Sequence, residues 1–257
     1  MLALENRCNI SEPIADNQSF RIFELKPDEF EFLQRRLIEI LPEYYVDPQS
    51  IANTLERLGK PAAARKLLTK IPEVTNIRSG DIGEVLATDY IEDSTDYVVP
   101  IRKLRWRDHR NMAMRGDDVI GFIFDLERQT IRFLKAEAKA NRRLSRDVLQ
   151  KARDELDNDQ GLPAPHALEF IAERLRELGN NTLSDLIEKV QLVDGIRADQ
   201  VEHLLFTFTA SNPDTLQKEA FEAYSGNINQ SSIGFRVIEH QQLIQNVYQE
   251  LIDGLDN

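Results

Sequence analysis

Two apolar segments separated by a short polar turn most constrain how this chain folds. Residues 119–124 and 130–138 are rich in β-branched, aromatic and other apolar side chains, and they flank the polar segment 125–129. Apolar runs of this length on either side of a short polar loop are typical of paired strands. The sequence therefore predicts an antiparallel hairpin in the middle of the chain.

The second strand of this hairpin should carry a charged pair on one face. Side chains alternate between the two faces of a strand, so one face receives every second residue. This face is expected to hold Ile131, Phe133, Lys135, Glu137 and Lys139. Asp118 precedes the first strand, where it should come within reach of the end of the second strand. Asp118, Glu137 and Lys139 are therefore expected to converge at one end of the sheet.

This group of side chains suits metal-dependent cleavage of a phosphodiester bond. Mg²⁺ binds through one or two carboxylates while keeping several waters and contacting substrate phosphate oxygens. Asp118, Glu137 and the carbonyl group of Ala138 would meet that need, and Mn²⁺ could take the same place. Lys139 would position or activate the attacking water and offset the charge that develops at phosphorus. The alternative is a polar turn, a buried strand and an exposed Glu/Lys pair with no catalytic role.

The spacing of Asp118, Glu137 and Lys139 across a hairpin resembles the signature of the PD-(D/E)xK nucleases. The segments GEVLATDYI, VPIRKLRWRDHRNMAMRGDDVIGF and KAEAKA are similar to the nuclease subunit of the Hachiman antiphage defence system, the HamA family. This resemblance implies a DNA endonuclease in the bacterial cytoplasm that is gated by a superfamily 2 helicase subunit. The superfamily pattern has a proline before the acid, whereas Gly116 and Asp117 stand here. Either Asp117 or Asp118 could therefore be the ligand.

A helix expected to begin near Ser79 contributes a further candidate. Its residues Ile82, Val85 and Leu86 share one side at 100° per residue, and Glu84 points nearly opposite. In the resembled superfamily, a glutamate on the helix before the core sheet often completes the metal site. Glu84 occupies that place in the order of the chain, although it could equally be an exposed helical acid.

The distribution of charge favours a nucleic-acid partner for the central region. The whole chain has a net charge of −12, but residues 101–153 hold 15 Lys and Arg against 7 Asp and Glu. A local basic field can attract a phosphate backbone even when the rest of the surface is acidic. Residues 97–107 are expected to form a strand with alternating cations, and Trp106 is expected to pack. The candidate DNA contacts are Lys103, Arg105, Arg107, Arg110, Arg115, Arg142 and Arg143.

Several classes of protein are disfavoured by the remaining sequence. No segment approaches the ~20 apolar residues of a membrane span, and the N-terminus does not resemble a signal peptide, which indicates a cytoplasmic location. Gly59-Lys60 is followed by Pro61 and lacks the glycine of a Walker loop, so this chain is not expected to bind a nucleotide. The histidines and the single cysteine, Cys8, have no spacing typical of a metal site.

The predicted architecture is an α/β fold with a mixed sheet flanked by helices and a PD-(D/E)xK-like core. Residues 1–75 are expected to form a strand and a helical lobe that docks a partner, and residues 76–257 the nuclease core. Residues 203–210 and 233–239 should be parallel strands, because a helical segment near 214–224 separates them. The competing functions are a nucleic-acid-binding or adaptor subunit that does not cut, and a nuclease acting on RNA.

Overall fold

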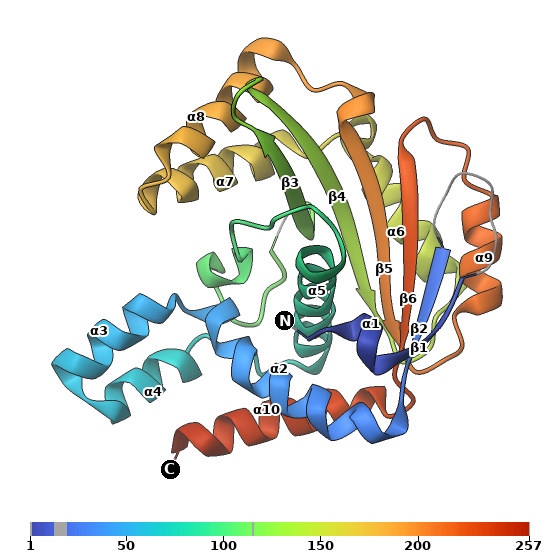
Figure 1. Ribbon diagram of the computed structural model, residues 1–257. Coiled ribbons are helices and arrows are strands. Elements are labelled where there is room, and N and C mark those ends of the chain that lie inside the picture. Colours follow the sequence, from blue (N-terminus) through green and yellow to red (C-terminus); the bar gives the residue numbers. More distant parts are fainter. Residues whose placement is uncertain (1, 13–19, 115, 257) are drawn as a thin grey trace.

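The protein is built around one mixed six-stranded sheet in the order β1-β2-β6-β5-β4-β3. The computed structural model describes residues 2–12, 20–114 and 116–256. Helices cover both faces of the sheet (Figure 1). The predicted α/β class with a mixed sheet is therefore confirmed, and its assignment to the PD-(D/E)xK superfamily stays a prediction.

The predicted hairpin is present at one edge of the sheet. Strands β3 (Val119–Asp125) and β4 (Thr130–Ala140) are antiparallel, and their register pairs Val119 with Ala136. Odd-numbered and even-numbered side chains of β4 point to opposite faces of the sheet. Phe133 and Leu134 accordingly pack into separate apolar clusters. The predicted alternation thus places Glu137 and Lys139 on the same face as Phe133.

The central strands are parallel, as the strand, helix and strand pattern predicts. Strand β5 (Val201–Thr209) pairs with β4 on one side and with β6 (Asn229–Arg236) on the other, and α9 (Asp214–Glu222) connects β5 to β6. Strand β2 (Phe20–Leu25) is parallel to β6, and β1 (Cys8–Ser11) is antiparallel to β2. The parallel strands carry continuous apolar runs because helices cover both of their faces.

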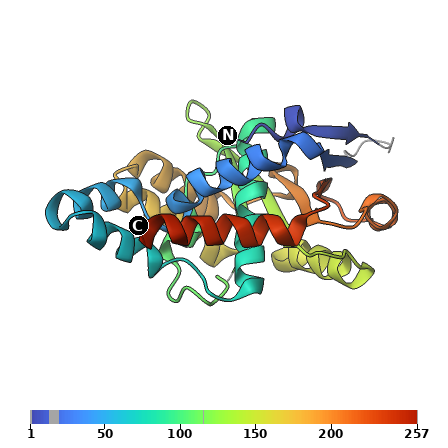
Figure 2. The same cartoon turned by 90° about the horizontal axis from the view of Figure 1, so that it is seen from below.

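One face of the sheet packs against a long helix, α5 (Thr75–Ser94), which lies across it in Figure 1. Ile82, Val85 and Leu86 of α5 are fully buried in the same cluster as Leu134 and Phe206 of the sheet. Helices α2 (Phe30–Tyr45) and α10 (His240–Asp256) contribute the outer part of this core. Figure 2 shows α10 running along this side of the molecule.

The opposite face is covered by helices α6 (Arg146–Asp157), α7 (Pro165–Glu177), α8 (Asn181–Lys189) and α9, and α9 packs on β2 through Phe221. Helix α6 follows β4 and packs on Leu205 through an apolar side that includes Leu149 and Leu156. Helices α7 and α8 pack against β3 and the beginning of β4. Glu137 and Lys139 therefore lie on the face that α6 covers.

The N-terminal 75 residues are only partly separate from the rest. Strand β2 belongs to the common sheet, and the short helix α1 (Leu4–Arg7) lies against β1 and β2. Helices α3 (Pro48–Leu58) and α4 (Lys60–Leu68) project at one end of the molecule in both views (Figures 1 and 2). No residue of α3 is buried, which distinguishes it from the helices of the core. Its role in docking a partner stays a prediction.

The prediction of a strand over residues 97–107 is wrong. Val98 makes an isolated bridge to Phe122, and residues 103–106 form a 3-10 helix, η2 (Lys103–Trp106). Tertiary contacts override the alternating pattern, because Leu104 is buried in the main core and Arg107 pairs with a buried carboxylate. The cations of this segment consequently do not line one side of a strand.

The start of α5 also differs from the prediction. The helix begins at Thr75, and neither Ser79 nor Asp81 is its N-cap. Asp81 is instead a buried residue of the helix interior that accepts a hydrogen bond from Tyr45.

Within the described residues, no helix is both long enough and apolar enough to cross a membrane.

Candidate active site

Asp118 and Glu137 lie side by side where β3 begins. Asp118 Oδ2 accepts a hydrogen bond from the backbone N–H of Ala138 at 3.0 Å, which fixes the carboxylate against β4. Burial and the neighbouring Asp118 raise the pKa of Glu137 well above its usual range. Two acidic groups held this close in a partly buried site repel each other until a cation joins them.

Lys139 supplies one such cation. Its ammonium group forms ion pairs with Glu137 and with Glu155 of α6. Burial disfavours the charged amine, but Glu137 and Glu155 outweigh burial and raise the pKa of Lys139. Lys139 is therefore a protonated donor at neutral pH, which suits positioning a water better than abstracting a proton from it.

Sequence reasoning missed Glu155, because α6 was notable for its cations. The position of Glu155 could have been inferred from the helix that follows β4. A helix that follows β4 and packs through Leu149 and Leu156 must pass over the face that carries Glu137 and Lys139. An acidic residue beside Leu156 is then within reach of Lys139.

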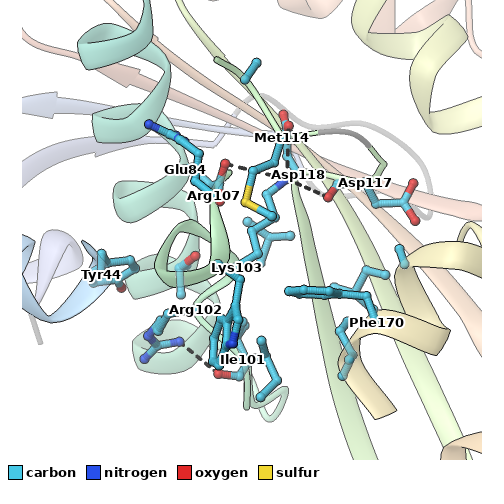
Figure 3. Close-up of a pocket in the computed structure, with 18 of the residues that line it drawn as sticks. Tyr44, Glu84, Ile101, Arg102, Lys103, Arg107, Met114, Asp117, Asp118 and Phe170 are labelled. Carbon is cyan, nitrogen blue, oxygen red and sulfur yellow. Dashed lines mark hydrogen bonds and ion pairs between the residues drawn. The ribbon is translucent and has the colours of Figure 1, made fainter. Parts of the chain in front are cut away.

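Glu84 reaches the same site from α5, with Lys103 between it and Asp118 (Figure 3). The Lys103 ammonium lies 3.7 Å from Glu84 Oε2 and 3.8 Å from Asp118 Oδ1. It also donates a 2.8 Å hydrogen bond to the Asp117 carbonyl oxygen. Burial raises the pKa of Glu84 to about 8, although Lys103 acts in the opposite direction.

The side chain of Asp117 points away from this group of charges. Its Oδ1 lies 3.4 Å from the Lys135 ammonium, and its Oδ2 accepts a 2.7 Å hydrogen bond from the backbone N–H of Ala164. Both side chains of the ion pair are almost completely buried, with 2% and 7% of their surface exposed for Lys135 and Asp117. These contacts favour Asp118 over Asp117 as a ligand.

The arrangement fits a hydrated divalent cation better than a closed metal site. In the part of the chain that the structure describes, no three His, Cys, Asp or Glu side chains gather closely enough to hold one ion. Mg²⁺ needs only one or two carboxylates when water and phosphate oxygens complete its coordination. Asp118 and Glu137 meet that requirement, and Lys103 lies between Asp118 and Glu84.

Two cavities adjoin the Asp118 and Glu84 side chains. The smaller, about 170 Å³, extends toward Gly80 near the start of α5 and reaches Lys139. The larger, about 450 Å³, extends between η2 and α7 and is bordered by Trp106 and Phe170. Met114 also borders both, so the two cavities adjoin each other.

The candidate DNA-contacting residues Arg105, Arg107 and Arg110, in η2 and the loop after it, are engaged by the protein itself. The guanidinium group of Arg107 is buried against Asp81, and its role as a DNA contact stays a prediction. Arg105 donates a 2.7 Å hydrogen bond to the Glu43 carbonyl, and Arg110 pairs with Glu73. The candidates Arg142 and Arg143 are exposed just after β4, and Arg115 lies outside the described residues.

Comparison with known proteins establishes the family. The HamA family model matches residues 3–251, nearly the whole chain. The chain belongs to the HamA family. A curated relative, the Hachiman protein HamA of Bacillus cereus, is 24% identical over 120 residues. That match covers 47% of this chain and 41% of the relative, so the chain spans less than half the length of the relative it matches.

The predicted resemblance is thus confirmed for the HamA family, and the matched region includes Glu84, Asp118, Glu137 and Lys139. Their roles as catalytic or metal-binding residues stay predictions. The match also extends through α3 and α4 and through the C-terminal strands. HamA-family membership therefore applies to the helical lobe as well as to the hairpin.

The raised pKa of Glu84 leads to a prediction about this HamA-family site. The carboxyl group has a usual pKa near 4.5 and a folded-state pKa of about 8, so the unfolded chain ionises first as pH rises. Glu84 therefore lowers the free energy of unfolding progressively between these two values. Without divalent metal, Glu84→Gln should raise the free energy of unfolding by about 4 kcal/mol at pH 8, and by less than about 1 kcal/mol at pH 5.

Urea unfolding at both pH values, in the presence of a chelator, measures this difference. Glu127→Gln is the matched control, because Glu127 is exposed in the turn between β3 and β4. A Glu84→Gln effect no larger at pH 8 than that of the control would contradict the prediction. Stabilisation by removal of a buried charge is typical of residues kept for function.

Proposed function

We propose that this HamA-family protein is a metal-dependent nuclease that hydrolyses DNA within a bacterial Hachiman antiphage defence complex. The observation that carries the proposal is the convergence of Asp118, Glu137 and Lys139 at one end of the β3 and β4 hairpin. The HamA family match and the name of the Bacillus cereus relative support the defence context.

The residues divide the chemistry between them. Bound Mg²⁺ or Mn²⁺, held by Asp118 and Glu137, would polarise the phosphate and lower the pKa of a water molecule. Lys139 holds the attacking water and stabilises the charge that develops on the phosphate oxygens. Glu155 keeps the Lys139 ammonium in place through their ion pair, and Glu84 assists through water.

The basic residues outside the site have a separate role in this proposal. Arg142 and Arg143 are exposed directly after the catalytic strand, where they can contact a phosphate group of the bound DNA. Arg105 and Arg110 can contribute only if they exchange their present partners, Glu43 and Glu73. Positioning of the DNA therefore depends more on the end of β4 than on the loop after η2.

A superfamily 2 helicase is the proposed partner and gate. The resemblance to the Hachiman nuclease subunit supports this part of the proposal, and the projecting helices α3 and α4 offer a surface for docking. Leu55 and Leu58 of α3 are 48% and 66% exposed. The helicase would bind and hydrolyse ATP and would relieve the restraint on the nuclease in a bacterial cytoplasm.

Plasmid cleavage with Mg²⁺ tests the nuclease proposal. The wild type is compared with the double variant Glu137→Ala/Lys139→Ala, each alone and with the candidate helicase and ATP. The control Glu127→Ala/Arg128→Ala likewise removes one acidic and one basic side chain, at the exposed turn of the same hairpin. We expect cleavage by the wild type and the control, and at least about a 10²-fold loss in the folded active-site variant.

The same experiment distinguishes the competing functions. Equal cleavage by all three proteins would point to contamination or to another site. Absence of cleavage under every condition would favour a nucleic-acid-binding or adaptor subunit that does not cut. One observation supports that second candidate, since the Lys103 ammonium group lies between Glu84 and Asp118 and can balance one of their charges. Competition between DNA and RNA substrates would separate a deoxyribonuclease from a nuclease acting on RNA.

A further inference from the structure

The larger of the two cavities beside Asp118 has an aromatic wall. Phe170 of α7 projects toward it (Figure 3). Trp106 of η2 packs against Phe170 with ring centroids 6.0 Å apart and planes at 85°. Both rings are only partly buried, so part of each ring is accessible. Further apolar contacts come from Ile101 and Met114. A volume of about 450 Å³ lies within the range of ligand-binding pockets, roughly 300–1,000 Å³.

The position of this cavity links it to the proposed chemistry. Glu84, Asp118 and Met114 border both the aromatic cavity and the smaller cavity that reaches Lys139. A phosphate group bound beside Lys139 has the aromatic cavity as its immediate neighbour. The nucleoside attached to that phosphate can therefore enter the aromatic cavity.

The charges around the aromatic cavity argue against a second phosphate as its occupant. Arg102 donates a 3.0 Å hydrogen bond to Glu92, and Arg107 is paired with Asp81. Lys103 is shared between Glu84 and Asp118. Among the described residues, the three Lys and Arg side chains on its wall are thus paired with carboxylates, and Asp117 and Asp118 add negative charge nearby. A flat, uncharged aromatic group fits such a wall better than an anion.

We propose that the aromatic cavity receives an unpaired nucleobase next to the scissile phosphate, so that the substrate is single-stranded DNA or a locally opened duplex. Bases stack readily on aromatic side chains, and a base must leave the duplex to enter a cavity. This inference rests on the proposed nuclease function and names the form of DNA that the site accepts. Phe170 provides the stacking surface, and Trp106 supports the Phe170 ring from the side.

Cleavage of matched single-stranded and duplex oligonucleotides with Mg²⁺ tests the inference. We expect the wild type to prefer the single strand. Phe170→Ala and Phe170→Leu should each lower single-strand cleavage about 5- to 150-fold, the range for loss of one stacked base, and Phe170→Tyr should retain it. Phe124→Ala is the matched control, because Phe124 packs against the same apolar cluster without bordering the cavity.

Substrates with an abasic nucleotide at successive positions locate the base that is bound. The wild type should lose cleavage when the abasic position adjoins the scissile phosphate, and Phe170→Ala should be insensitive to that change. Equal cleavage of single strand and duplex, together with an unchanged Phe170→Ala rate, would overturn the inference while leaving the nuclease proposal intact.

A binding measurement keeps the inference testable without cleavage. Oligonucleotides containing 2-aminopurine lose fluorescence when that base stacks on an aromatic ring. Binding of the Asp118→Asn protein should lower the fluorescence of the single-stranded oligonucleotide more than that of the duplex. Binding of the Asp118→Asn/Phe170→Ala protein should lower neither. If quenching is absent in both variants, the cavity does not bind a base. If quenching is present while no protein cleaves DNA, the inference about the cavity holds and the nuclease proposal fails.

Discussion

Asp118→Asn is expected to lower the rate of DNA cleavage about 10²- to 10³-fold, whereas Asp117→Asn should leave the rate of the folded protein largely unchanged. The two residues are neighbours in the chain, but their side chains have different partners. Asp118 faces Glu137 and Lys103, where its charge would hold a metal ion. Asparagine preserves its size and can still accept the hydrogen bond from Ala138.

The free energy of unfolding should follow the opposite order, with Asp117→Asn the less stable of the two variants. Asp117→Asn removes the charge that balances the buried Lys135 ammonium, and breaking a buried ion pair costs about 3–5 kcal/mol. The lower end applies, because Lys135 keeps its hydrogen bonds to the carbonyl oxygens of Asn158 and Leu162. Asp118→Asn should change the free energy of unfolding little, since it relieves the repulsion with Glu137.

Initial cleavage rates and urea unfolding of both variants measure this reversal. Rates are compared at a temperature where each variant is folded, as judged by circular dichroism. A cleavage loss confined to Asp117→Asn, with an unchanged rate in Asp118→Asn, would make Asp117 the ligand. The prediction therefore decides between the two acids that the sequence left open.

The hairpin could be predicted because its signal is local. Alternation along β4 and the polar turn before it are sufficient to bring Asp118, Glu137 and Lys139 together. Residues 97–107 show the limit of such reasoning. Their alternation of cations and apolar residues also fits a strand, but burial of Leu104 and the pair between Arg107 and Asp81 impose a 3-10 turn instead.

The partners of charged residues were harder to predict than the residues themselves. Lys103 was expected to contact DNA, and in the structure it lies between Glu84 and Asp118. Glu155 was not considered, although it pairs with Lys139. Both contacts join segments distant in the sequence, and they depend on where a helix crosses the sheet. Sequence alone identifies the catalytic candidates better than the groups that orient them.

Arg107→Met is expected to lower the free energy of unfolding by about 3–5 kcal/mol, because it leaves a buried carboxylate without its cation. Arg107 Nη1 lies 2.9 Å from Asp81 Oδ2, and the two side chains are only 5% and 4% exposed. Tyr45 donates a 2.7 Å hydrogen bond to the same carboxylate, and its hydroxyl group lies 2.6 Å from that of Tyr248. This network joins α2, α5 and α10 to the loop that carries Lys103 and Trp106.

Urea unfolding with two further variants isolates the buried charge as the cause. Arg110→Met removes an ion pair with Glu73 whose side chains are 32% and 60% exposed, so it should cost no more than about 1 kcal/mol. Asp81→Asn/Arg107→Met should recover part of the stability lost in Arg107→Met, because the unpaired charge is gone. If Arg107→Met costs no more than Arg110→Met, the network does not hold the loop. If the double variant is as unstable as the single one, lost packing rather than unpaired charge explains the effect.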